Sequence, residues 1–309
     1  MLDRFLYYCI ALPLSYMPLW MIYLLFDLFH VIIRFIIPYR KKVIYKNIKN
    51  SFPEMSEKEQ GKIVRQFYRY FADLFAESVK NLTISERKLR KRLKVRNPEV
   101  MSKLYDQKKN VILLSSHYNN WEFLINGQPL LFDFKAVGIG MPLSNKFWDK
   151  KLNDRRERFG MAVVNANNYK EVLSNFSDKN TATLILNDQS PGKNENCYWT
   201  QFLGQETAFY FGAEILANQM DTAVVNAIIH KVKRGFYEID LQLITTAPQN
   251  ESYGFITQTY INQLEETIRQ KPQYWLWSHK RWKKEVPENL EELKANHQKR
   301  FEEKFRKKT

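Results

Sequence analysis

The stretch Val111-Ile-Leu-Leu-Ser-Ser-His-Tyr-Asn-Asn-Trp-Glu122 contains the signals of a strand, a turn and a helix in succession. Its first four residues are aliphatic and predict a short buried strand, while its adjacent asparagines tolerate turn conformations. On one regular helix, His117 and Glu122 would lie about 140° apart and would not share a face. We therefore expect a bend, with His117 at the end of the strand and Glu122 inside the following helix. Open α/β sheets bind ligands at such strand ends.

The pairing of an imidazole with a nearby carboxylate indicates acid–base chemistry. The imidazole of His117 can accept a proton, and the carboxylate of Glu122 can hold the ring's tautomer and stabilise its cation. These two groups are half of an acyl-transfer site. A hydrogen-bonded surface or core pair is the alternative that the two residues leave open.

Short aliphatic runs alternate with helical patterns from residue 93 onward, which predicts an α/β sheet. The expected strands are Leu93–Arg96, Val111–Leu114, Lys135–Ile139, Thr181–Leu186, Ala223–Ile229 and Phe236–Ile244. The expected helices are Ser144–Phe159, Asn168–Phe176, Thr207–Gln219, Gly254–Gln270 and Glu288–Phe305. A further long helix should begin at Ser56, because Ser56 and Glu59 fit a capping box. We divide the chain into a membrane anchor (1–37), a helical connecting region (38–92) and an α/β domain (93–309).

The motif around His117 resembles a known family. Ser116-His-Tyr-Asn-Asn-Trp-Glu122 is similar to the His-x4-Glu/Asp motif of the glycerolipid and lipid A acyltransferase superfamily, and its Asn-Trp-Glu ending looks most like the bacterial lipid A late acyltransferases. Asn119 stands where many relatives carry glycine. The resemblance implies a glycerolipid-acyltransferase-like mixed sheet flanked by helices, with catalytic roles for His117 and Glu122.

The N-terminus is apolar enough to anchor the chain in a membrane. Leu6–Phe26 contains no formally charged residue and is close to the roughly 20 residues that cross a hydrocarbon core. A cleaved signal peptide is the main rival, but no small-x-small cleavage site follows. Pro13 and the charges after Phe26 leave a tilted, interfacial or re-entrant helix open.

The charge distribution indicates a cytoplasmic main domain beside an anionic partner. Five basic residues lie between Arg40 and Lys49, against only Arg4 before the apolar segment, so the positive-inside rule places the rest of the chain in the cytoplasm. A net charge of +15 and the dense basic block of Glu86–Arg96 suit anionic lipid headgroups or an acidic acyl carrier protein. No nucleic-acid-binding signature is present. Cys9 and Cys197 indicate neither a disulfide framework nor a thiol metal site.

Four further candidates belong to the expected substrate site. Arg156 and Arg158 precede a glycine, and guanidinium groups bind phosphate through a planar fork; relatives carry a similar Arg-x-Arg element. Asp188 and Gln189 follow the strand Thr181–Leu186, and in relatives such a pair borders the active site. A solvated helix end and a capped turn are the structural alternatives.

Two later motifs extend the resemblance. Gly204 lies in a loop that we expect to lead into a helix whose N-terminus holds a phosphate or an oxyanion, although a tight turn explains the glycine equally well. Lys271-Pro-Gln-Tyr-Trp-Leu-Trp-Ser-His-Lys-Arg-Trp282 closely resembles a stretch of the lipid A acyltransferases. We interpret His279 and Arg281 as structural or headgroup-binding.

The resemblance, together with the apolar N-terminus, implies an O-acyltransferase of the bacterial inner membrane that faces the cytoplasm. It would move an acyl chain from an acyl carrier protein or coenzyme A thioester to a hydroxyl of a lipid A precursor as the membrane lipid acceptor, and it would need neither a cofactor nor a metal. A lysophospholipid or aminolipid acyltransferase, a thioesterase and a non-catalytic membrane adaptor are the alternatives.

Overall fold

The computed structural model of the chain describes residues 1–37, 39–174, 180–192 and 197–306. A seven-stranded mixed sheet forms its centre, in the order β1-β9-β8-β2-β5-β3-β4. The strands of this sheet are β1 (Leu93–Val95), β2 (Val111–Ser115), β3 (Lys135–Gly140), β4 (Ala162–Asn165), β5 (Thr181–Leu186), β8 (Ala223–Lys233) and β9 (Phe236–Thr245). All neighbouring pairs are parallel except β8 and β9, which are antiparallel. The expected mixed α/β sheet is confirmed.

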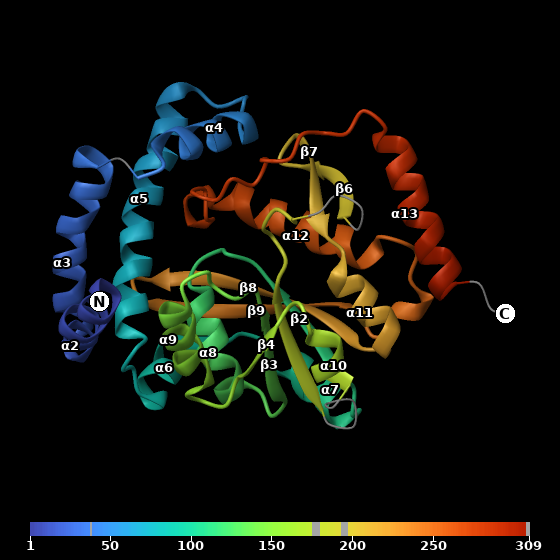
Figure 1. Cartoon of the computed structure of the whole chain (residues 1–309), viewed down its shortest axis with the longest axis horizontal. Coiled ribbons are helices and arrows are strands. Elements are labelled where there is room, and N and C mark those ends of the chain that lie inside the picture. The colour runs from blue at the N-terminus through green and yellow to red at the C-terminus, as the bar shows by residue number, and fades with distance from the viewer. Residues whose placement is uncertain (38, 175–179, 193–196, 307–309) are drawn as a thin grey trace.

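Helices cover both faces of the sheet (Figure 1). They are α1 (Leu2–Phe5), α2 (Leu12–Tyr16), α3 (Leu19–Val31), α4 (Lys41–Ser51), α5 (Glu57–Lys80), α6 (Glu86–Arg92), α7 (Glu99–Asp106), α8 (Trp121–Leu131), α9 (Lys146–Glu157), α10 (Tyr169–Ser174), α11 (Gly212–Met220), α12 (Phe255–Gln270) and α13 (Leu290–Phe305). Short π-helical turns lie at Leu6–Ala11 and Ile32–Ile36, and 3-10 turns at Pro248–Asn250 and Pro272–Tyr274.

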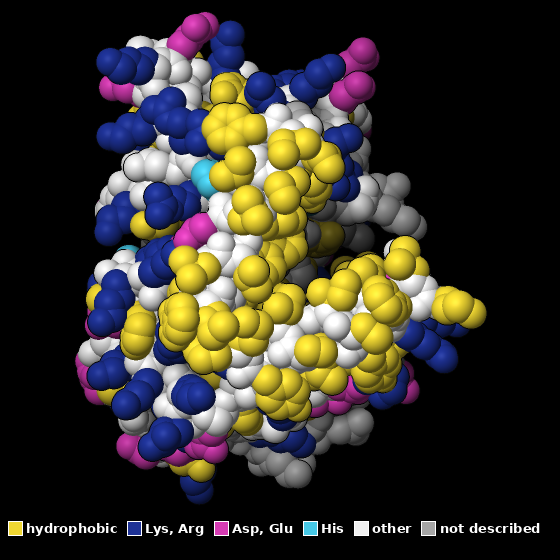
Figure 2. Space-filling model, turned by 90° about the vertical axis from the view of Figure 1, so that its left-hand side faces the viewer, with side chains coloured by type: hydrophobic (Ala, Val, Ile, Leu, Met, Phe, Trp, Pro, Cys, Tyr) yellow, Lys and Arg dark blue, Asp and Glu magenta, His cyan; other side chains and the backbone are white. Residues whose placement is uncertain are grey.

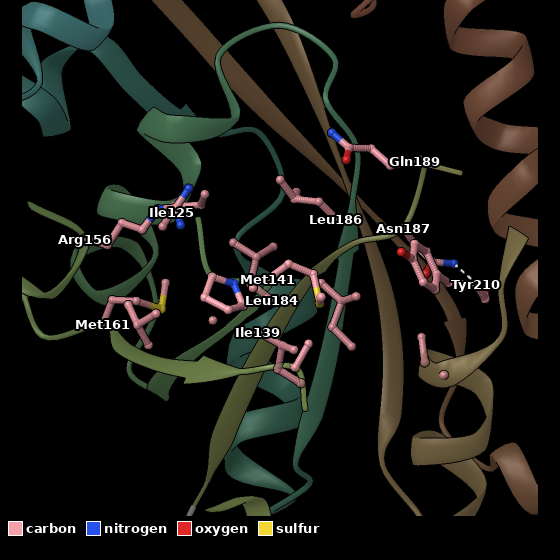
Figure 3. A pocket seen from close by; sticks show the side chains of 18 of the residues that line it. Ile125, Ile139, Met141, Arg156, Met161, Leu184, Leu186, Asn187, Gln189 and Tyr210 are labelled. Atoms are coloured by element: carbon pink, nitrogen blue, oxygen red, sulfur yellow. Dashed lines mark hydrogen bonds between the residues drawn. The ribbon is translucent and has the colours of Figure 1, made fainter. Parts of the chain in front are cut away.

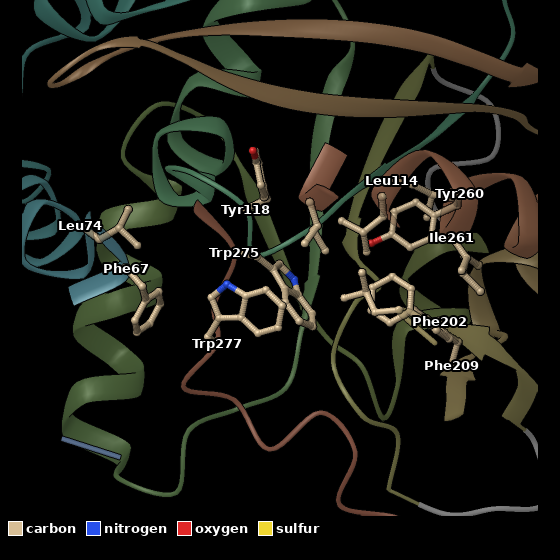
Figure 4. Close-up of a cluster of buried hydrophobic side chains, with 14 of the residues drawn as sticks. Phe67, Leu74, Leu114, Tyr118, Phe202, Phe209, Tyr260, Ile261, Trp275 and Trp277 are labelled. Carbon is tan, nitrogen blue, oxygen red and sulfur yellow. The ribbon is translucent and has the colours of Figure 1, made fainter. Parts of the chain in front are cut away.

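Strand β2 lies at the centre of the sheet, and all five of its residues are buried. Side chains alternate across a strand, so Ile112 and Leu114 enter the core on one face while Val111 and Leu113 enter the core on the other. The first core joins α4, α5 and α12 to aromatic residues from the C-terminal region (Figure 4). A strand buried on both faces requires the continuous aliphatic run that the sequence shows.

One expectation for the sheet region needs correction. Thr207–Gln219 is not one helix, because Gln205–Tyr210 is strand β7 and α11 begins only at Gly212. Strand β7 pairs with β6 (Cys197–Phe202) in an antiparallel hairpin. Leu203 and Gly204 form its turn, both with positive φ, and β-branched and aromatic residues at alternate positions of the hairpin explain the strands. Part of the expected helix Asn168–Phe176 lies outside the described residues.

The N-terminal segment is also not the single helix that Leu6–Phe26 suggests. The backbone turns to extended conformation at Met17 and Pro18, so α2 ends before α3 begins. With the π-helical turn after it, α3 forms the helix Leu19–Ile36. This helix is both long enough and apolar enough to cross a membrane. The long helix beginning after Ser56 is confirmed, and Ser56 and Glu59 make the reciprocal hydrogen bonds of a capping box.

Candidate active site

The register of two neighbouring strands brings His117 and Asp188 together. Strands β2 and β5 pair in parallel so that Ser115 lies opposite Leu186, the last residue of each. His117 and Asp188 follow these residues at the same spacing, so both leave the same edge of the sheet. This edge is formed by strand carboxyl ends, as expected for a ligand site in an α/β protein.

Asp188 holds the His117 ring in one tautomer. His117 Nδ1 lies 2.7 Å from Asp188 Oδ1, and the backbone N–H of His117 donates to Asp188 Oδ2 at 3.0 Å. The indole N–H of Trp275 donates to the same oxygen at 2.9 Å. Burial opposes the ionisation of Asp188, but the charge of His117 and these hydrogen bonds outweigh it and lower the pKa of the carboxyl. Because an ionised Asp188 accepts the Nδ1 proton, Nε2 carries the lone pair when the ring is neutral.

The other ring nitrogen of His117 faces a polar side chain and a cavity. The side-chain nitrogen of Gln189 lies 3.1 Å from His117 Nε2, as fits an amide N–H that donates to the lone pair. His117 and Gln189 both line the cavity. A substrate hydroxyl that replaced this amide contact would meet a nitrogen able to accept its proton.

Glu122, expected to orient His117, lies between two arginine side chains. Arg155 donates to Glu122 Oε2, and Arg156 Nη2 lies 2.7 Å from Oε1. Burial opposes the ionisation of Glu122, but the two guanidinium groups outweigh it and lower the pKa of the carboxyl to about 2. Helix α8 begins at Trp121 and directs Glu122 toward α9, which carries both arginines. The carboxylate hydrogen-bonded to His117 is therefore Asp188, and a catalytic role for Glu122 stays a prediction.

The expected pair Arg156 and Arg158 is divided by the structure. Arg156 lines the cavity and binds Glu122. Arg158 donates to the backbone oxygens of Leu82 and Ile84, both at 2.6 Å, and is not among the residues that line the cavity. At about 100° per residue, Arg155 lies about 100° around the helix from Arg156 and Arg158 lies about 200° from it, which is why Arg155 and not Arg158 accompanies Arg156.

Gly204 does not lie where the sequence suggested. It occupies the turn of the β6–β7 hairpin with φ of +73°, a conformation that glycine adopts without strain. Strand β7 separates it from α11, so Gly204 is not at a helix N-terminus. The tight-turn alternative explains this residue.

The backbone after His117 makes the bend that the sequence requires. Asn119 has φ of +55°, in the left-handed region, which glycine adopts freely and asparagine tolerates better than most residues. Its side-chain Nδ2 donates to the Ile229 carbonyl at 2.8 Å, and its backbone N–H donates to the Tyr274 carbonyl at 2.9 Å. The Tyr70 hydroxyl donates to the Asn119 carbonyl at 2.8 Å. One side-chain contact and two backbone contacts thus fix Asn119 in this conformation.

Asn119→Ala should destabilise the protein by about 1–3 kcal/mol, because alanine resists the left-handed conformation and cannot donate to Ile229. Asn119→Gly should cost less, since glycine keeps the backbone free to adopt φ of +55°. Thermal unfolding of the two detergent-solubilised variants measures the difference. Equal Tm values for alanine and glycine at this position would contradict the argument.

A buried carboxylate supports the same turn from the side of α5. Glu77 accepts hydrogen bonds from the hydroxyls of Tyr23 at 2.6 Å and Tyr237 at 2.8 Å, and from Asn120 Nδ2. The Asn120 side chain also caps α8, since its Oδ1 accepts from the Phe123 N–H. Burial raises the pKa of Glu77. Glu77 therefore connects the N-terminal helix α3, the start of strand β9 and the start of the helix that carries Glu122.

The cavity beside His117 has a volume of about 640 Å³. Aliphatic and sulfur-containing side chains dominate its walls, and Arg156 and Gln189 lie at its margins (Figure 3). The apolar lining residues are Ile125, Ile139, Met141, Pro142, Leu143, Leu152, Met161, Val163, Ala166, Leu184, Ile185, Leu186, Ala213 and Leu216. This volume lies in the ordinary range of small-molecule sites, and the lining suits a flexible hydrocarbon chain.

His279 and Arg281 are structural parts of this region, as interpreted from the sequence. His279 Nε2 accepts the backbone N–H of Ser190 at 3.1 Å, which holds the loop after Gln189. Burial lowers the pKa of His279 to about 4, so the ring is neutral. Arg281 is 1% exposed and donates to Thr207 Oγ1 at 2.9 Å. Neither residue lines the cavity.

The sequence as a whole matches one known family. The family described as "Bacterial lipid A biosynthesis acyltransferase" matches residues 1–284. The chain belongs to this family. It is also 21% identical over 247 residues to "Lipid A biosynthesis lauroyltransferase" of Escherichia coli (strain K12), an alignment that covers 79% of each protein. The family supports an acyltransferase activity toward a lipid A precursor for this chain.

Sequence reasoning missed three contacts of this lipid A acyltransferase family member. It placed Asp188 at a strand end but did not pair it with His117, and it gave no role to Trp275 or Arg155. Two polar residues that follow adjacent parallel strands at equal spacing are the signal for the first pair. That signal requires the strand order, which the sequence does not state.

Proposed function

We propose that this protein is a membrane-bound O-acyltransferase that moves a fatty acyl chain from an acyl thioester to a hydroxyl of a lipid A precursor. The observation that carries the proposal is the position of His117, whose Nδ1 is held by Asp188 while its Nε2 faces an apolar cavity. A base beside a site for a hydrocarbon chain is what acyl transfer to a hydroxyl needs. Membership in the lipid A acyltransferase family supports the acceptor class.

The reaction needs no covalent enzyme intermediate. His117 Nε2 removes the proton of the acceptor hydroxyl while the oxygen attacks the thioester carbonyl. The tetrahedral intermediate collapses, the carbon–sulfur bond breaks, and the imidazolium returns the proton to the leaving thiolate. Ionised Asp188 stabilises the imidazolium throughout, as a buried carboxylate does in hydrolase triads.

The oxyanion of the intermediate needs donors that are free to meet it. The backbone N–H groups of His117 and Asn119 already donate to Asp188 and to the Tyr274 carbonyl, so they do not serve. The Gln189 amide and the Arg156 guanidinium both line the cavity. We assign Gln189 to the oxyanion and Arg156 to a phosphate of the donor or the acceptor. Glu122 holds Arg156 in place through an ion pair.

The partners follow from charge and from the apolar N-terminus. A net charge of +15 favours an anionic membrane surface, and an acidic acyl carrier protein is the donor that such a surface would attract. We propose the cytoplasmic side of the bacterial inner membrane as the location of the catalytic domain, with acyl-coenzyme A as the alternative donor.

The test is transfer by the purified full-length protein in mixed micelles. A labelled acyl thioester is supplied with a lipid A precursor, with a lysophospholipid or with no acceptor, and the products are identified by mass spectrometry. Acylation of the lipid A precursor supports the proposal. Preferred acylation of the lysophospholipid indicates a different acceptor class, thioester hydrolysis unchanged by any acceptor indicates a thioesterase, and no movement of acyl groups indicates an adaptor.

The preference for acyl donors of a given chain length should depend on the cavity wall formed by Gly138 and Met161. A Cβ added at Gly138 would lie 3.1 Å from Met161 Sδ, so Gly138→Val narrows the cavity. We expect it to lower kcat/KM for long acyl donors by about 10-fold or more relative to shorter ones, because one or two methylenes in an apolar pocket are worth about 1–3 kcal/mol. Met161→Ala should shift the preference toward longer donors. Competition between two donors, read by mass spectrometry, measures both; identical product ratios in all three proteins would show that this wall does not touch the acyl chain.

A further inference from the structure

Helices α1 to α3 present a continuous apolar surface (Figure 2). Its members are the exposed residues Leu2, Phe5, Leu6, Tyr8, Ile10, Tyr16, Trp20, Leu24, Leu25, Leu28, Val31, Phe35, Ile36 and Ile37, which we call the apolar band. Lys and Arg side chains gather on both sides of the band. On α3 and the π-helical turn after it, the spacing of Trp20, Leu24, Leu28, Val31 and Phe35 places them on one face.

The opposite face of α3 packs along its length on α5 and on the β8–β9 turn. Leu19, Ile22 and Tyr23 are buried with Ala76 of α5, and the Tyr23 hydroxyl donates to buried Glu77. Farther along the helix, Asp27 forms an ion pair with Arg234 of the β8–β9 turn, with Nη2 and Oδ1 2.6 Å apart. The face of α3 opposite the apolar band is therefore occupied by contacts with the rest of the protein.

The start and the middle of the apolar segment also contact the rest of the protein. Near the N-terminus, Asp3 accepts hydrogen bonds from the Trp148 indole at 2.8 Å and from Asn145 Nδ2 at 3.1 Å. At the bend between α2 and α3, Lys80 Nζ donates to the backbone oxygens of Ser15 and Met17, both at 2.8 Å. A segment whose start and middle are bound to the same domain as its end does not leave one terminus on the far side of a membrane.

The contact at the end of the segment completes this arrangement. The Tyr68 hydroxyl of α5 donates to the Tyr39 carbonyl at 2.9 Å, and Arg40 Nη1 donates to the Ser278 carbonyl at 2.9 Å. The chain is thus tied down immediately after the apolar band.

We propose that α1 to α3 lie within one leaflet of an anionic phospholipid bilayer as a monotopic surface and do not span the membrane. This inference rests on the membrane association proposed above, but not on the acyl-transfer reaction. The band enters the acyl region of the leaflet, its aromatic residues lie at the interface, and the flanking basic side chains meet lipid phosphates.

A spanning arrangement would conflict with the polar contacts of α3. Tilting Leu19–Ile36 across the bilayer would either pull α5, with its charged Arg65 and Arg69, into hydrocarbon or detach α3 and expose Asp27 there. A charged side chain at the centre of a membrane helix costs about 2.5–3.5 kcal/mol or more. Lying in the leaflet keeps each of these groups at the protein or at the interface.

The same arrangement places the cavity near the bilayer. Helix α9 holds Asp3 through Asn145 and Trp148, and its residues Leu152 and Arg156 line the cavity. The adjoining wall residues Met141 and Leu143 are 64% and 46% exposed. A lipid chain in the leaflet can therefore reach the cavity beside α9 without crossing water.

The first experiment compares short epitope tags at the two termini of the full chain. In intact spheroplasts, external protease should spare both tags, and both should be digested after permeabilisation. Digestion of the N-terminal tag alone would show a spanning helix and overturn the proposal. Digestion of both tags would overturn the orientation as well, whereas recovery of the protein in the soluble fraction would refute membrane association itself. None of these readouts depends on catalysis.

The second experiment measures depth. Spin labels at Trp20, Leu24, Leu28, Val31 and Phe35, one per variant in Cys9→Ser protein, are examined in phosphatidylethanolamine–phosphatidylglycerol vesicles. We expect similar depths at all five sites. The labels span about 22 Å along the helix, so a crossing helix would show its middle deepest and its ends near the surface, which would overturn the proposal.

Paired substitutions check that the band makes the contact. Leu28→Glu should weaken vesicle binding at least tenfold, while Val286→Glu, which also adds one carboxylate at an exposed apolar residue but lies outside the band, should not. Loss of binding by Val286→Glu alone, or by neither protein, would contradict the assignment. Circular dichroism of the three proteins shows whether each is folded.

Discussion

His117→Ala is expected to lower kcat for acyl transfer by about 10²–10⁴-fold, the ordinary contribution of a positioned general base. The cavity remains in the variant, so KM for the acyl donor should change little. The fold should persist, because Asp188 keeps the indole N–H of Trp275 and the backbone N–H at position 117 as partners. Initial rates with purified protein and thermal unfolding measure the two quantities.

A matched control uses a histidine outside the cavity. His230 lies in β8 and is not among the residues that line the cavity, so His230→Ala should retain nearly wild-type kcat. A folded His117→Ala enzyme with wild-type turnover would exclude His117 as the base and with it the proposed reaction. Equal losses in the two histidine variants would indicate a general effect on stability.

The sequence predicted the parts of the fold that are governed by local pattern. The aliphatic run before His117 became a strand buried on both faces, and Ser56 with Glu59 became the predicted capping box. The local pattern failed where the signal is short or mixed. The pattern from Thr207 alternates weakly and predicts a helix, although Gln205–Tyr210 pairs with β6 as a hairpin. This pairing is not visible until both strands are placed.

The candidate site shows the same division. His117, Asp188 and Gln189 were recognised as residues at strand ends, and the structure brings all three together. Their pairing depends on the order of β2 and β5, since Glu122 is closer to His117 in sequence but α8 directs it toward Arg155 and Arg156. In this structure the carboxylate nearest to His117 in sequence is not its hydrogen-bond partner, because a helix begins between His117 and Glu122.

The N-terminal segment illustrates a further limit. Composition identified an apolar stretch in Leu6–Phe26, but the bend at Met17 and Pro18 and the contacts of Asp3 and Tyr23 with the domain are tertiary features. Hydropathy averages over a window and does not distinguish a helix with lipid on all sides from one with a protein-facing side.

The two carboxylates near His117 give the second large prediction. Asp188→Asn should lower kcat by up to about 10⁴-fold, because an amide that donates toward Nδ1 favours the wrong ring tautomer and no longer stabilises the imidazolium. The shape of the side chain is kept, so the hydrogen bond from the Trp275 indole can persist and Tm should fall only modestly. Rates at several pH values separate this effect from a general loss of folded protein.

Glu122→Gln should act through the arginines instead. The carboxyl has a pKa of about 2, so at neutral pH the substitution removes the one negative charge that Arg155 and Arg156 share. We expect a change in KM for the phosphate-bearing substrate and a loss of stability of about 1–3 kcal/mol, because two partly buried guanidinium groups lose a charged hydrogen-bond acceptor. The kcat of the folded fraction should fall much less than in Asp188→Asn. If Glu122→Gln abolishes turnover in folded protein while Asp188→Asn does not, Glu122 orients His117 during the reaction, and the ion pairs of Glu122 with Arg155 and Arg156 must open when substrate binds.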